Sequence, residues 1–80
     1  MLKKKLVEVT WQDPTIDAGW VDDDHHTPLT KLKSYGILIR NTPHIVIAGS
    51  YDSVQKKYAD RTKFPKGCVE SIRVIEVLSL

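Results

Sequence analysis

Residues 37–48 read Ile-Leu-Ile-Arg-Asn-Thr-Pro-His-Ile-Val-Ile-Ala, two blocks rich in β-branched side chains around a turn. Branching at Cβ favours extended backbone, because such side chains pack well on a pleated surface. The proline of the Asn-Thr-Pro segment cannot donate to a β ladder and therefore ends the first block. The stretch predicts a hairpin in which Ile37–Arg40 pairs with His44–Ala48.

Short blocks of the same kind lie on both sides of this hairpin. Leu6–Trp11 alternates, with Val7, Val9 and Trp11 on one face, and predicts a half-buried first strand. We expect the indole N–H of Trp11 to bond to a neighbouring group. Across the chain, 8 Val, 7 Ile and 6 Thr stand against 3 Ala, and this composition favours strands over helices.

The remaining strands follow from the same pattern. The hairpin's first strand begins near Leu32, and Gly36 inside it permits a bend, a bulge or a close backbone approach. Arg61–Phe64 is compatible with a short strand, the Pro65-Lys66-Gly67 segment reverses the chain, and Val69–Leu80 predicts a long final strand.

Two connections are polar. The segment between Asp13 and about Thr30 is longer than most connections in a compact domain, which marks it for function. In the stretch Tyr51–Asp60 we expect one helical turn capped by Asp52 or Ser53.

A chain of 80 residues and 9.1 kDa has room for one hydrophobic core, and we expect residues 1–80 to form a single domain. Cys68 is the only cysteine, which excludes an internal disulfide and a zinc site of several cysteines. No apolar run reaches the roughly 18 residues of a membrane span, and the start lacks the apolar stretch of a signal peptide. We therefore expect a soluble, cytoplasmic protein without a membrane partner.

These blocks predict an all-β fold, a small five-stranded antiparallel barrel of the SH3 or Sm type with one long loop after the first strand. In such barrels a proline followed four residues later by an aliphatic side chain commonly marks the turn before the final strand. Pro65 and Val69 have this spacing.

Four motifs are spaced over roughly residues 5–75: Trp11-Gln12-Asp13, Gly19-Trp20, Gly36-Ile37-Leu38, and the segment from Phe64 to Val69 before Ile72. In these motifs the chain resembles a group of small β-barrel proteins encoded by bacteriophages. Those barrels are similar to the anti-CBASS type of sponge protein, which holds a cyclic-nucleotide alarm signal of bacterial antiphage immunity without cleaving it and works as a small homo-oligomer. The resemblance implies the same activity in the cytoplasm of an infected bacterial host.

Charge is distributed unevenly, because residues 1–26 carry a net charge of −3 and residues 27–80 a net charge of +5. Cations neutralise phosphates and aromatic faces stack on bases, and Tyr51–Lys66 interleaves both. This segment predicts a nucleotide-binding site; the alternative is a solvated loop with Tyr58 and Phe64 in the core. Trp20 either anchors the long loop onto the barrel or forms one side of the ligand pocket. The candidate ligand-binding residues are Trp20, Tyr51, Lys56, Lys57, Tyr58, Arg61 and Lys63.

Residues 22–26, Asp-Asp-Asp-His-His, are of types that bind divalent metals. Adjacent residues seldom converge on one ion, and we interpret this run as a solvated acidic loop. We expect His44 to be a hydrogen-bonding residue at a strand edge rather than a ligand contact. Cys68 is interpreted as a small buried apolar group rather than a nucleophile. The sequence thus predicts no catalytic residue, no metal ligand and no cofactor.

The leading hypothesis is an immune-evasion protein of a phage, not an enzyme, that sequesters a small cyclic nucleotide. One alternative is an Sm- or SH3-like adaptor that binds RNA or a protein. A second is a metal-dependent phosphodiesterase built on the acidic loop.

The final strand predicts assembly. It carries aliphatic groups on both faces, whereas a half-exposed strand of a monomer keeps one face polar. We therefore expect a homo-oligomer with its interface at Ile75, Val77, Leu78 and Leu80. The alternative is that the long loop folds over this strand within one chain.

Overall fold

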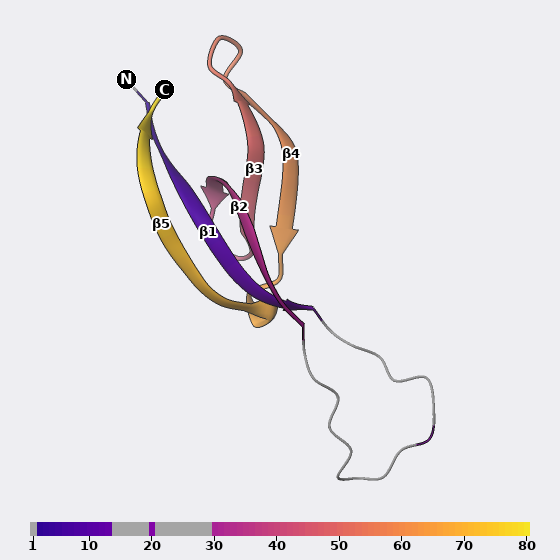
Figure 1. Ribbon diagram of the computed structural model, residues 1–80. Helices are drawn as coiled ribbons and strands as arrows, with labels where there is room; N and C mark the ends of the chain where they lie inside the picture. The colour runs from indigo at the N-terminus through magenta and orange to yellow at the C-terminus, as the bar shows by residue number, and fades with distance from the viewer. Residues whose placement is uncertain (1, 14–19, 21–29) are drawn as a thin grey trace.

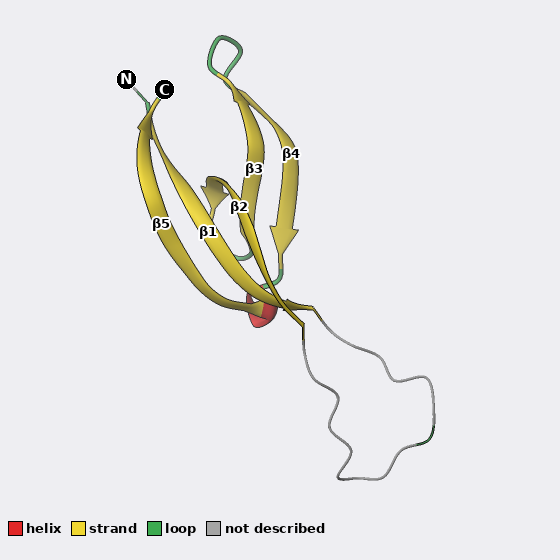
Figure 2. Cartoon of the chain, viewed as in Figure 1, coloured by secondary structure: helices red, strands yellow, loops and turns green. Residues whose placement is uncertain are grey.

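The structure is a computed structural model that describes residues 2–13, 20 and 30–80. Its elements are strands apart from one short 3₁₀ helix, as Figure 2 shows, and the all-β class is confirmed. In chain order they are β1 (Lys3–Asp13), β2 (Thr30–Arg40), β3 (Ile45–Asp52), β4 (Lys57–Phe64), η1 (Lys66–Cys68) and β5 (Val69–Ser79).

The five strands form one antiparallel sheet in the order β4-β3-β2-β1-β5. The predicted β2–β3 hairpin is present. The first and last strands lie side by side with both chain ends together (Figure 1), and Leu2 and Leu80 exchange two backbone hydrogen bonds of 2.8 and 3.2 Å.

Strand β2 changes partner at Ile37. Its residues up to Ile37 pair with β1, and its residues from Ile37 onward pair with β3. At Gly36, a Cβ atom would lie 2.8 Å from the carbonyl oxygen of Ala48 and 3.2 Å from the side chain of Ile47. Of the three features that Gly36 permits, the structure therefore shows the close backbone approach, and this approach allows β2 to pair with both halves of the sheet.

The core joins the two halves of the sheet. Its buried residues are Val7 and Val9 of β1, Ile45 and Ile47 of β3, and Phe64 of β4. The rings of Trp11 and Phe64 are 5.4 Å apart, although β2 and β3 separate their strands in the sheet order. Such a contact requires the sheet to fold over its own apolar face.

The alternation expected for β1 is also confirmed, because Trp11 packs against the core that contains Val7 and Val9. Its Nε1–H donates a 2.9 Å hydrogen bond to the hydroxyl of Ser34 on β2. Strands β4 and β5 end the sheet, and within the described residues no ladder joins them. The ladders therefore establish a folded antiparallel sheet and do not show a closed barrel.

The single helical turn expected within Tyr51–Asp60 is present, because the backbone N–H of Lys56 donates a 2.8 Å hydrogen bond to the carbonyl of Asp52. It does not extend to Tyr58, which lies on β4. The carboxylate of Asp52 caps this segment, accepting 2.9 and 3.1 Å bonds from the backbone N–H groups of Val54 and Gln55. Lys56 then adopts a positive φ of 59°, which stops helical geometry and returns the chain as β4. Strand β4 spans Lys57–Phe64 and is longer than the expected Arg61–Phe64, because the polar composition of its first residues is typical of a loop.

The predicted reversal after β4 is present as η1, where the N–H of Cys68 donates to the carbonyl of Pro65 at 3.0 Å. Most of the long connection after β1, including the acidic run at 22–26, lies outside the described residues. Within the part of the chain that the structure describes, no helix has the length and apolar character required to cross a membrane.

We expect Gly36→Ala to lower the free energy of unfolding by about 1–3 kcal/mol, because its methyl group has to displace the backbone of β3. Gly67→Ala is the matched control, since nothing lies within 4 Å of its Cβ position. Both substitutions restrict the unfolded chain equally. Urea denaturation measures the difference, and equal midpoints for the two variants would contradict the close approach.

Candidate functional site

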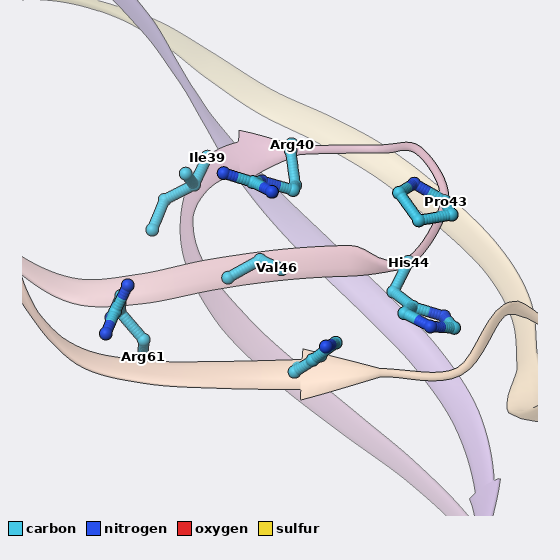
Figure 3. Close-up of a pocket in the computed structure, with 7 residues that line it drawn as sticks. Ile39, Arg40, Pro43, His44, Val46 and Arg61 are labelled. Atoms are coloured by element: carbon cyan, nitrogen blue, oxygen red, sulfur yellow. The ribbon is translucent and has the colours of Figure 1, made fainter.

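One surface pocket, here called the cationic pocket, has a volume of about 620 Å³. It lies on β2, β3 and β4 at the end of the sheet where the β2–β3 turn is located (Figure 3). Its lining residues are Ile39, Arg40, Pro43, His44, Val46, Arg61 and Lys63.

Strand register brings these side chains together. Val46 on β3 pairs with Arg40 on β2 and with Lys63 on β4. Arg61 lies two residues before Lys63 and therefore points to the same face of β4. Since Ile45 and the residues of its face are buried in the core, Val46 points outward and forms the floor. Figure 3 shows Arg40 and Arg61 on the strands that flank it.

The electrostatics of the pocket are one-sided. Arg40, Arg61 and Lys63 contribute three positive charges, and no carboxylate lines the pocket. Among the described residues, the ion pairs all involve other cations. Guanidinium groups donate two parallel hydrogen bonds to a phosphate or a carboxylate, and ammonium groups add a point charge. The pocket is therefore suited to an anion that carries more than one negative charge.

His44 completes the pocket beside the turn. Its Nδ1 atom is buried and has no hydrogen-bond partner among the described residues. The expected strand-edge hydrogen bond is thus not made by this atom, whose burial without a partner is unfavourable.

The predicted site residues fall in different places. Arg61 and Lys63 lie in the cationic pocket, and sequence reasoning missed their neighbours Arg40 and His44. The sequence feature that could have predicted this neighbourhood is the Asn-Thr-Pro turn between Arg40 and His44. A tight hairpin turn brings its flanking side chains close together.

Tyr51 and Tyr58 form a cross-strand pair whose ring centroids are 4.9 Å apart. The ammonium of Lys4 lies 5.8 and 5.2 Å from these two rings, and its hydrogen bond to Tyr58 raises the pKa of Lys4. At a strand rise of roughly 3.3 Å per residue, the pair lies about 17 Å along β3 from Val46. The aromatic and cationic residues that alternate in the sequence therefore occupy separate places.

The other candidates line neither pocket. Lys56 is in the β3–β4 turn, and Lys57 pairs with Asp52 at the start of β4. The side chain of Trp20 is fully exposed and does not anchor the long connection onto the sheet.

A second pocket, here the apolar pocket, has a volume of about 330 Å³. The half-buried Cys68 lines it beside the rings of Trp11 and Phe64, which agrees with a mainly apolar role for Cys68. The full lining is Trp11, Gln12, Thr62, Lys63, Phe64, Pro65 and Cys68.

Metal-ligating side chains do not cluster in the described ranges, where no three His, Cys, Asp or Glu residues are arranged to hold an ion. The run at 22–26, interpreted from the sequence as a solvated acidic loop, is outside those ranges.

Glu8 is the centre of a separate charged cluster on the other half of the sheet. It is buried and accepts a 3.1 Å hydrogen bond from Arg73 Nη2 and a 3.0 Å bond from the Tyr35 hydroxyl. The ammonium of Lys33 lies 3.7 Å from its other oxygen. The bond from Arg73, followed by that from Tyr35, lowers the pKa of Glu8. This carboxylate is fully engaged within the chain and is better suited to holding β1, β2 and β5 together than to catalysis.

Comparison with known proteins finds no matching family model, no matching curated protein and no matching solved structure.

The Glu8 cluster predicts an acid-sensitive contribution to stability. Its bonds exist only in the folded chain and hold the folded pKa below the ordinary value of 4.5. Their contribution is therefore complete above the unfolded pKa and is lost as pH falls through the folded pKa. Denaturation between about pH 7 and pH 3 should show a smaller loss of stability in Glu8→Gln than in the unsubstituted chain. Glu76→Gln is the control, since Glu76 is exposed, and equal pH profiles for both variants would contradict this role.

Proposed function

We propose that this chain is a binding protein that sequesters a phosphate-bearing nucleotide in the cationic pocket without cleaving it. The observation that carries the proposal is the convergence of Arg40, Arg61 and Lys63 on one pocket that contains no carboxylate. In the context that the phage resemblance implies, the ligand is a cyclic nucleotide of host antiphage signalling. The site of action is then the cytoplasm of the infected bacterium.

Binding without hydrolysis is supported by the residue types around the pocket. Arg40, Arg61 and Lys63 are hydrogen-bond donors that bind phosphate oxygens without accepting a proton from an attacking water. Hydrolysis requires a base or a metal-bound water aimed at the phosphorus, and the lining offers only the imidazole of His44 for that work.

A thermal-shift screen with cyclic di- and trinucleotides tests the proposal. A ligand at 100 times its Kd adds about 2.7 kcal/mol of stability. Arg61→Glu/Lys63→Glu should abolish the shift, because each lost charge-assisted bond costs roughly 1.5–3 kcal/mol, or about 10- to 100-fold in affinity. Lys56→Glu/Lys57→Glu makes the same change in charge outside the pocket and should keep full affinity.

The same screen separates the alternatives. Heat denaturation of the complex should release the nucleotide intact, whereas a cleaved product would favour the phosphodiesterase. Binding of oligonucleotides alone, with affinity that falls steeply as salt rises, would favour an RNA adaptor. Equal loss of binding in the two double variants would remove the cationic pocket as the site.

We also propose that the chain assembles through β5. Within the described residues β5 pairs only with β1, and it exposes Val74, Ile75 and Val77 by 48%, 42% and 53%. The opposite edge, β4, exposes no large hydrophobic side chain, and its exposed charged residues oppose edge-to-edge pairing. Leu78 and Leu80 are already half-buried within the chain, and the free apolar surface of β5 is therefore provided by Val74, Ile75 and Val77.

Light scattering tests this assembly at tens of micromolar. The unsubstituted chain should have a mass that is a multiple of 9.1 kDa, and Ile75→Lys/Val77→Lys should return it to the monomer mass. Val54→Lys is the control, because Val54 is 87% exposed and belongs to the β3–β4 turn rather than to β5. A monomeric unsubstituted chain would end the proposal.

A further inference from the structure

We infer that the apolar pocket holds the base of the same ligand whose phosphate lies in the cationic pocket. This inference rests on the proposed function and narrows it, because it requires a ligand with both a phosphate and an aromatic ring system. Inorganic phosphates and sugar phosphates would then occupy only the cationic half of the site.

The two pockets adjoin at Lys63, which lines both. Lys63 lies between Thr62 and Phe64, two further residues of the apolar pocket. Because β4 is an edge strand, no strand among the described residues is hydrogen-bonded along its free edge. A ligand can therefore contact the cations on one side of β4 and reach the apolar pocket around the strand's free edge.

The apolar pocket has the chemistry that a nucleobase requires. The half-buried Trp11 presents part of its indole, and aromatic faces stack on bases of any sequence. Gln12 and Thr62 supply an amide and a hydroxyl, which donate and accept hydrogen bonds at the base edge. The volume of about 330 Å³ is at the small end of ligand pockets and suits one ring system.

The reactivity of Cys68 reports whether the apolar pocket is occupied, because Cys68 lines this pocket and is the only cysteine in the chain. The experiment measures the rate at which a thiol reagent modifies Cys68 with the nucleotide that gives the largest thermal shift, and with inorganic pyrophosphate. At 100 times its Kd the nucleotide should slow modification about 100-fold, because only the unoccupied fraction reacts. Pyrophosphate, which fills only the cationic pocket, should leave the rate unchanged.

Trp11 gives a second readout that does not depend on thiol reactivity. In Trp20→Phe it is the only tryptophan, and the replaced side chain is fully exposed. The nucleotide should change the Trp11 emission and pyrophosphate should not. In Arg61→Glu/Lys63→Glu the nucleotide should lose both effects, since one ligand spans both pockets.

The outcomes distinguish this inference from the proposed function. A nucleotide that shifts the melting temperature but changes neither Cys68 modification nor Trp11 emission overturns the placement of the base and leaves the proposed function standing. Protection by pyrophosphate equal to that by the nucleotide overturns it too, as does protection that survives in Arg61→Glu/Lys63→Glu. A panel in which no nucleotide binds overturns both proposals.

Discussion

The contact between the backbones of β2 and β3 at Gly36 determines how the sheet folds. Because no side chain occupies that position, β2 approaches Ala48 closely while its two ends pair with different neighbours. The change of partner brings β1 and β4 near each other across the core, where Trp11 contacts Phe64. The floor of the cationic pocket depends on the same arrangement, since Val46 is held between Arg40 and Lys63.

Positively charged side chains occur in two environments in this molecule, one that contains a carboxylate and one that does not. Arg73 and Lys33 surround the buried carboxylate of Glu8 and stabilise the β2–β1–β5 half of the sheet. Arg40, Arg61 and Lys63 gather on the β2–β3–β4 half without a carboxylate in their pocket. The first group is neutralised within the chain, whereas the second forms no ion pair among the described residues, a difference that residue type alone does not reveal.

The two edge strands also differ in a way that separates binding from assembly. Strand β4 carries charged residues along its exposed length, including Arg61 and Lys63 of the cationic pocket, and these oppose pairing with another chain. Strand β5 exposes Ile75 and Val77, which favour contact with another copy. Under both proposals, ligand binding uses one edge of the sheet and assembly uses the other, and an oligomer keeps its binding sites accessible.

The sequence by itself determined the strand class, the β2–β3 hairpin, the face of β1 that includes Trp11, and the turn at Pro65, because each depends on residues that are close in the chain. It also pointed to Arg61 and Lys63. Only the tertiary structure decided that Arg40 and His44 join them, and that Tyr51 and Tyr58 lie at the far end of β3. The physical reason is register: the hydrogen bonds between strands, and not spacing along the chain, fix which side chains meet.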